Sequence, residues 1–189
     1  WGLLNQVDWS LDLEILITVI VLDFMIYLQH VIVHRVPLLW RFHIVHHTDL
    51  DLDVSSGFRF HPVEILVSML YKMTLVLIIG PTPFATMLFE AILNGMSLFT
   101  HSNIKLPKSL DRFLQYLIVT PDMHLIHHST KTNETNSNYG FNLSIWDRLL
   151  DSYIVKEKSS QSKIIVGIEN YREPKQVSLK KLLLMPFRS

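Results

Sequence analysis

The chain has 189 residues, and its 17 lysine and arginine residues balance its 17 aspartate and glutamate residues. This balance leaves no basic excess for nucleic acid, and the lack of cysteine excludes disulfides, thiolate metal ligands and a cysteine nucleophile. Hydrophobic residues make up 49% of the chain and its mean hydropathy is +0.26, which favours a membrane protein. From the length we expect one domain, and because the sequence begins at Trp1 rather than Met, we expect an upstream segment.

Three apolar segments carry the high hydropathy: Leu16–Leu28, Val63–Ile79 and Phe84–Phe99. With its flanks, each segment gives about 17–20 helical residues, which is the length that crosses a bilayer core. The first segment is not a signal peptide, since its leading flank is acidic and no small-residue cleavage site follows. Buried helices of a soluble bundle are the alternative. The few polar residues inside the segments fall in stripes, which favours membrane helices.

The first half of the chain predicts three long helices and their connections. In chain order these are a helix over 10–34, a polar connection over 35–60 with a short helix near 39–47, a helix over 62–79, a tight turn at 80–83 and a helix over 84–101. Pro62 suits the first position of the second long helix, where its missing N–H costs nothing.

The second half predicts shorter elements. In chain order these are an amphipathic stretch over 105–119 lying in the membrane interface, a helix that begins after the cap Thr120, a polar loop over 131–140, a short helix within 143–153, a strand-like run over 163–169 and a basic amphipathic end over 178–187. We therefore expect a membrane-embedded domain over 1–155 and a polar tail over 156–189.

The chain holds ten histidines: His30, His34, His43, His46, His47, His61, His101, His124, His127 and His128. In the expected topology they all fall on one face of the membrane, because the far side contains only the turn at 80–83. Seven basic residues share that face: Arg35, Arg41, Arg59, Lys105, Lys108, Arg112 and Lys131. By the positive-inside rule this face is cytoplasmic. The predicted fold is all-α, an integral membrane helical bundle with a histidine-rich cytoplasmic cap of short helices.

Eight of the histidines fall into three groups whose members differ by three or four positions: His30 and His34; His43, His46 and His47; His124, His127 and His128. Offsets of three and four return to one helix face, so each group is expected to direct its imidazoles at one spot. Imidazole suits iron, zinc, copper or nickel. Eight ligands are too many for one tetrahedral zinc and enough for two ions. A single histidine pair is often only solvated, but three converging groups indicate a metal site.

Two polar stripes on the long helices support this interpretation. The first runs through Asp23, Tyr27, His30 and His34, and the second through Glu90, Asn94, Ser97 and His101. Metal-bound histidines usually donate their other ring nitrogen to an acceptor. The candidates for this role are Asp23, Tyr27, Glu90, Asn94 and Asp122, and the alternative for each is a hydrogen bond in helix packing.

Two further histidines, His61 and His101, are possible additional ligands. "HPVE" also matches a helix start in which His61 is the cap, so its role stays open.

The segments "QHVIVH", "FHIVHH" and "MHLIHH" follow the histidine pattern of the fatty acid hydroxylase/sterol desaturase superfamily, and "DFMIYLQH", "FRFHPVE" and "NYGFNLSIWDRLLDSY" resemble its bacterial members. The resemblance covers about residues 20–153. It implies an integral membrane di-iron oxygenase that acts on a lipid, with the eight grouped histidines as metal ligands. It also implies two iron ions and O2, with zinc as a possible substitute in purified protein.

The function expected from this resemblance is hydroxylation of a lipid C–H bond in the bacterial inner membrane or the ER membrane. We expect no fused haem domain, so electrons would come from a separate reductase, ferredoxin or cytochrome. A desaturase would use the same ligands. A membrane metal transporter or store is the alternative of another class, but the far half of each segment carries no histidine for an ion path. The sequence does not choose the lipid.

Overall fold

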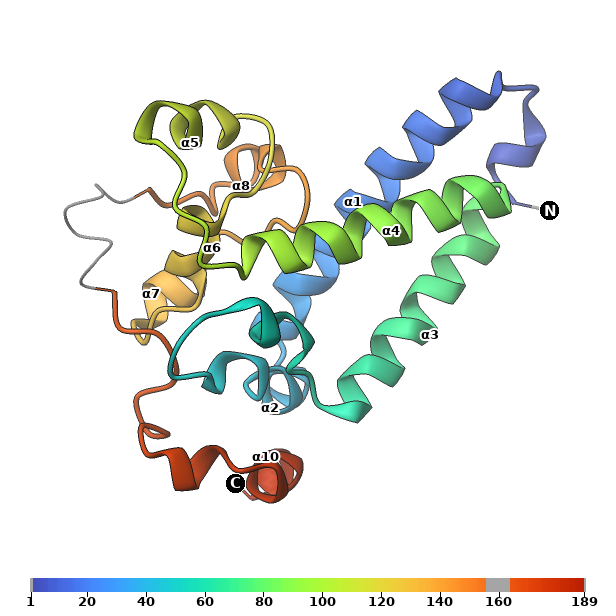
Figure 1. Ribbon diagram of the computed structural model, residues 1–189. Helices are drawn as coiled ribbons and strands as arrows, with labels where there is room; N and C mark the ends of the chain where they lie inside the picture. Colours follow the sequence, from blue (N-terminus) through green and yellow to red (C-terminus); the bar gives the residue numbers. More distant parts are fainter. Residues whose placement is uncertain (1, 156–163, 189) are drawn as a thin grey trace.

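A computed structural model describes residues 2–155 and 164–188. Within these ranges the regular structure is helical (Figure 1). The α-helices are α1 (Leu11–Arg35), α2 (Pro37–His43), α3 (Pro62–Ile79), α4 (Pro83–Thr100), α5 (Lys108–Leu114), α6 (Pro121–His127), α7 (Thr132–Thr135), α8 (Ile145–Leu149) and α10 (Leu179–Leu184). The 3-10 turns are η1 (Leu4–Gln6), η2 (His46–Thr48), η3 (Val54–Phe58), η4 (Pro174–Val177) and η5 (Met185–Phe187).

The three long helices α1, α3 and α4 form an open wedge (Figure 1). Gly80 ends α3 with φ of +70°, a left-handed conformation that glycine adopts without steric cost. Thr82 then caps α4 by accepting a hydrogen bond from the Ala85 N–H. From this turn α3 and α4 diverge, and a buried apolar cluster joins α1 to both near the turn: Leu22, Ile26, Leu75, Ile79 and Phe89. The wedge is therefore closed at the turn and open toward the short helices.

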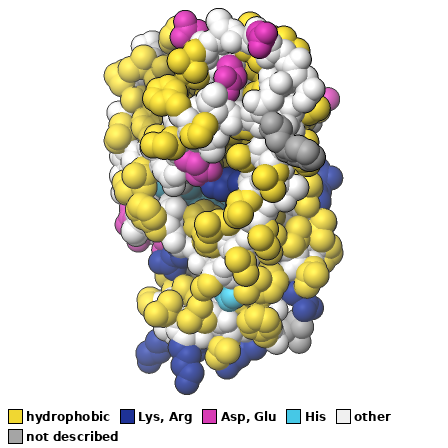
Figure 2. Space-filling model, turned by 90° about the vertical axis from the view of Figure 1, so that its right-hand side faces the viewer, with side chains coloured by type: hydrophobic (Ala, Val, Ile, Leu, Met, Phe, Trp, Pro, Cys, Tyr) yellow, Lys and Arg dark blue, Asp and Glu magenta, His cyan; other side chains and the backbone are white. Residues whose placement is uncertain are grey.

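Two of the described helices, α1 and α3, are long and apolar enough to cross a membrane; α4 is not among them. The helix α3 exposes a row of large apolar side chains: Ile65, Leu66, Val67, Met69, Leu70, Met73, Leu77 and Ile78. Figure 2 shows hydrophobic side chains covering most of one face of the molecule. A continuous apolar surface of this kind is typical of contact with lipid or another protein.

The short elements gather where α1 and α4 end (Figure 1). The predicted Thr120 cap is confirmed, because its side chain accepts from the Met123 N–H at the start of α6. In the tail, residues 164–188 pack under α2, with Leu182 and Met185 against Val45. The predicted strand-like run does not form a strand. Its first residue lies outside the described ranges, and the rest makes one isolated bridge, between Val166 and Ser129.

Two other local predictions were inaccurate. The short helix expected near 39–47 begins earlier, at Pro37, and ends at His43. The histidines that follow lie on the 3-10 turn η2, which changes the directions of their side chains. The polar loop expected over 131–140 contains one helical turn, α7.

Candidate metal centre

Nine of the ten histidines form two buried clusters. The first, cluster A, consists of His30, His34, His43, His47 and His127; the second, cluster B, consists of His46, His101, His124 and His128. In each cluster one ring nitrogen per histidine lies within 4.8 Å of the others. The clusters adjoin, because the ring of His47 stacks on that of His128 with centroids 4.5 Å apart. The arrangement is a pair of neighbouring all-imidazole sites.

The expectation that each sequence group points at a single spot was wrong for two of the three groups. The group in 43–47 sends His43 and His47 to cluster A and His46 to cluster B. The group in 124–128 likewise sends His127 to cluster A and the other two to cluster B. The reason is rotation: neighbours in sequence point about 100° apart on a helix, so the middle histidine of each of these two groups diverges from the other two. The groups in 43–47 and 124–128 thus each contribute to both sites, whereas His30 and His34 both belong to cluster A.

Cluster B shows ligand-like spacing between ring nitrogens. The Nε2 atom of His101 lies 3.2 Å from Nε2 of His46 and 3.1 Å from Nε2 of His124, which lies 3.1 Å from Nε2 of His128. Two nitrogens bound at right angles to one ion, each about 2.1 Å from it, are about 3 Å apart. His101 also binds the Ser97 carbonyl oxygen through Nδ1 at 2.7 Å, so its Nε2 carries the lone pair in the neutral ring. These residues fit a metal ion.

In cluster A, hydrogen-bond acceptors next to the Nδ1 atoms fix the orientation of the rings. His30 Nδ1 lies 2.7 Å from the Tyr139 carbonyl oxygen, and His127 Nδ1 lies 2.7 Å from the Ser137 carbonyl oxygen. Their Nε2 atoms are buried and have no hydrogen-bond partner among the described residues. An acceptor at Nδ1 selects the tautomer whose Nε2 is free to bind metal, and buried polar atoms without partners are otherwise costly. Cluster A therefore also fits a metal ion.

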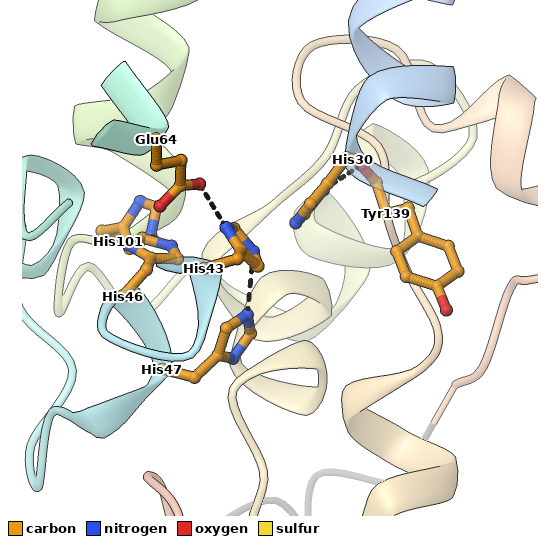
Figure 3. Close-up of polar contacts among 7 residues, drawn as sticks. All are labelled: His30, His43, His46, His47, Glu64, His101 and Tyr139. Carbon is orange, nitrogen blue, oxygen red and sulfur yellow. Dashed lines mark hydrogen bonds and ion pairs between the residues drawn. The ribbon is translucent and has the colours of Figure 1, made fainter. Parts of the chain in front are cut away.

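In cluster A a third ring, that of His43, is held in its orientation by a carboxylate. His43 Nδ1 lies 2.5 Å from Oε1 of Glu64, which reaches it from the first turn of α3, and His43 Nε2 lies 3.3 Å from Nε2 of His47 (Figure 3). Figure 3 also shows His30 pointing toward this pair from α1. Glu64 thus joins α3 to the metal centre.

The loop that supplies the two carbonyl acceptors is held by Asp147. Its carboxylate is fully buried and accepts from the N–H groups of Tyr139 and Gly140 at 2.7 and 2.8 Å. A Cβ at Gly140 would lie 2.8 Å from Oδ2 of Asp147 and 2.9 Å from a methyl carbon of Val119, so only glycine fits there. The loop is therefore fixed in place before any metal binds.

Burial keeps the imidazoles neutral. Desolvation lowers the pKa of His101 to about 4 and that of His127 to about 3, although a backbone hydrogen bond opposes the shift in both. Desolvation likewise lowers the pKa of His46, His47 and His128 well below the ordinary value. Neutral rings at neutral pH keep the lone pairs that a metal ion requires.

The remaining candidate histidine has a different place. His61 belongs to neither cluster; its Nδ1 accepts from the Val63 N–H at the start of α3, and its Nε2 lies 3.3 Å from the Leu183 carbonyl oxygen. It acts as a helix cap and a contact to the tail.

The residues expected to support the histidines mostly bind elsewhere. Asp23 Oδ2 accepts from Trp146 Nε1 at 2.8 Å and from the Leu143 N–H at 3.2 Å. Tyr27 pairs with the Ser152 hydroxyl at 2.8 Å. The other two contacts are the ion pair of Glu90 with Lys72 and the bond from Asn94 Nδ2 to the Glu90 carbonyl oxygen. Asp122 lies in the first turn of α6, just before the histidine group of that helix.

The supporting groups that the sequence reading missed are Glu64, Asp147 and the backbone carbonyls of residues 137 and 139. Glu64 was visible only as the acidic third residue of α3, a position that also serves helix capping. Backbone carbonyls carry no side-chain signal, so no pattern could have identified them.

Fold and site together define a helical protein with two adjoining histidine clusters that could each hold a metal ion, beside apolar helices. The chain belongs to the fatty acid hydroxylase family, whose model matches residues 15–152. Ornithine lipid hydroxylase OlsE of Rhizobium tropici is 32% identical over 147 residues, which cover 77% of this chain and 43% of that protein.

Two other relatives are more distant. Alkylglycerol monooxygenase of Xenopus tropicalis is 25% identical over 185 residues, 96% of this chain and 40% of that protein. Human cholesterol 25-hydroxylase is 28% identical over 138 residues, 72% of this chain and 50% of that protein. The chain thus spans half or less of these relatives. No solved structure matches it.

Proposed function

We propose that the protein is a membrane di-iron oxygenase that hydroxylates a C–H bond of a lipid with O2 and external electrons. The observation that carries the proposal is the pair of adjoining, buried all-imidazole clusters. Cluster A and cluster B would each hold one iron ion, and the bound pair would supply O2 activation and C–H cleavage. One oxygen atom enters the lipid, and the other leaves as water after uptake of two electrons and two protons.

The chain's own residues prepare this site in three ways. Glu64 and the carbonyls of Ser137 and Tyr139 hold His43, His127 and His30 in the orientation that presents Nε2. Burial keeps the His127 ring neutral and excludes bulk water from the site. These roles need no movement of the fold, so the ligand set is organised in advance.

The surroundings proposed for this site are an integral membrane bundle over residues 1–155, with the short helices as a cytoplasmic cap and residues 156–189 as a tail. The apolar helices α1 and α3 and the exposed apolar row on α3 support it. The electron donor is proposed to be a separate reductase, ferredoxin or cytochrome.

Hydroxylation is favoured over desaturation, because the relatives named above are hydroxylases and a monooxygenase. The test is to purify the protein in detergent, measure iron per chain, and supply O2, a reductase and lipid extract. We expect bound iron and products heavier by one oxygen atom. A product lighter by two hydrogen atoms would indicate a desaturase. Iron-loaded protein that oxidises no lipid in any extract would refute the proposal.

A further inference from the structure

A cavity of about 150 Å³ lies in the wedge between α3 and α4 and leads to cluster A. Its lining includes His30 and His43 of cluster A and the apolar side chains of Ile26, Leu93 and Phe141. Figure 2 looks onto this side of the molecule, where lysine or arginine atoms and acidic atoms lie in a hollow within the hydrophobic surface. A lipid could therefore reach the histidines sideways, from the apolar surroundings of α3.

The cavity is more polar than a hydrocarbon chain requires. On α3, Glu64, Ser68 and Lys72 are spaced by four residues and all line it; Asn94 and Ser97 face them from α4. Lys72 forms an ion pair with Glu90, in which Nζ of the lysine lies 2.8 Å from Oε2 of the glutamate. Buried polar atoms are costly unless they are hydrogen-bonded, and an occupant made only of methylene groups would offer nothing to Oε2 of Glu64, which is buried and has no hydrogen-bond partner among the described residues.

The polar atoms that line the cavity would be matched by an occupant that both donates and accepts hydrogen bonds. Oε1 of Gln29 lines the cavity side of α1, is buried, and has no hydrogen-bond partner among the described residues. It needs a donor. The Lys72–Glu90 pair is neutral as a unit, so it favours neither an anion nor a cation. Both side chains stay reachable, with Lys72 24% and Glu90 36% exposed. A hydroxyl or an amide meets all these requirements.

We propose that this cavity binds the hydroxyl- or amide-bearing part of a lipid, with Gln29 accepting from it and the Lys72–Glu90 pair bonding to its other polar group. Glu64 and Lys72 are eight residues apart on α3, about 12 Å along the helix. The polar part of the lipid would thus extend from the histidines to the ion pair. The oxidised carbon would then lie next to the polar part of the lipid and not in the middle of a hydrocarbon chain. This inference rests on the proposed function.

Binding of two matched probes to the iron-loaded protein in nanodiscs tests the inference. One probe is a hexadecyl glycerol ether with two free hydroxyls, and the other is the same ether with both hydroxyls methylated. Calorimetric titration gives the dissociation constants. We expect the diol to bind about tenfold or more tightly than the methylated probe, since hydrogen bonds to charged groups and to buried acceptors contribute that much. Equal binding of the two probes by the wild-type protein would overturn the inference.

Variants assign the preference to the named residues. Gln29→Leu removes the acceptor, and the double variant Lys72→Met with Glu90→Gln removes both charges together. In each variant the ratio of the two dissociation constants, methylated probe over diol, should fall close to one, while the iron content stays unchanged. Thr74→Val is the control, because Thr74 is on α3 but its hydroxyl bonds only to the Leu70 carbonyl in the same helix. Retention of the full preference in both cavity variants would refute the assignment.

The two proposals fail separately. A wild-type protein that prefers the diol but oxidises no lipid would refute the oxygenase and leave the polar subsite standing. A protein that oxidises lipid and binds both probes equally would refute the subsite alone.

Discussion

The Nδ1 atom of His43 lies 2.5 Å from Oε1 of Glu64, and this contact joins the start of α3 to the metal centre. The two side chains are 3% and 11% exposed, so water does not compete with the contact. The carboxylate fixes the ring so that Nε2 faces His47.

Glu64→Ala should weaken metal binding by about 10–100-fold, because loss of an acceptor behind a ligand histidine has an effect of this size. Competition with a chelator, followed by metal analysis, measures the affinity. Asp51→Asn is the matched control, since Asp51 is an exposed acid in the connection that leads to α3. Wild-type affinity in Glu64→Ala would show that the contact does not support the ligand.

The division into two clusters predicts how metal content responds to single histidine changes. His34→Ala affects cluster A and His124→Ala affects cluster B. Each should lower bound metal to about half, since the other ligand set stays complete. Metal analysis of protein purified by the same protocol measures this. His61→Asn should keep full metal, because asparagine also caps a helix. A loss in His61→Asn as large as in His34→Ala would contradict the assignment of His61 as a cap.

Asp23 should matter for stability more than for metal. Asp23→Asn weakens the charged acceptor of Trp146 Nε1 and the Leu143 N–H, and we expect a loss of about 1–3 kcal/mol in the free energy of unfolding. Metal content should stay near the wild-type value. Thermal unfolding in detergent measures the first quantity. Trp146→Phe combined with Asp23→Asn should cost less than the two single changes added together, because they share one bond. Strict additivity would argue against that bond.

The metal-free protein should lose stability as the pH falls. The pKa is about 4 for His101 and about 3 for His127 in the folded chain, against about 6.5 for an unperturbed histidine. Below about pH 6.5 the unfolded chain therefore binds more protons than the folded one, and stability decreases until the folded pKa is reached. Between pH 6.5 and 5 each histidine should cost about 1–2 kcal/mol.

Thermal unfolding of chelator-treated protein across this pH range checks the prediction. His127→Gln provides the comparison, since glutamine does not titrate and should flatten the pH dependence. A melting temperature that does not change from pH 7 to pH 5 in the wild type would contradict it.

Local sequence determined where the three long helices lie and what starts and ends them. The apolar runs are long enough to form membrane-length helices. Pro62 and Thr120 lie where helices begin, and Gly80 lies where α3 ends. The same local rules placed the histidines near helix ends. These features depend on residues a few positions apart, so the pattern contains the information that fixes them.

Tertiary structure decided how the histidines are shared between the two clusters and what holds them. His46 and His47 are neighbours in sequence but point to different sites, because η2 rotates one toward α4 and α6 and the other toward α1. Glu64 meets His43, and Tyr139 meets His30, only where helices distant in sequence cross. Asp23, aligned with His30 on α1, instead bonds to Trp146. Spacing gives the direction of a side chain on its own helix, but its partner is set by how the helices pack.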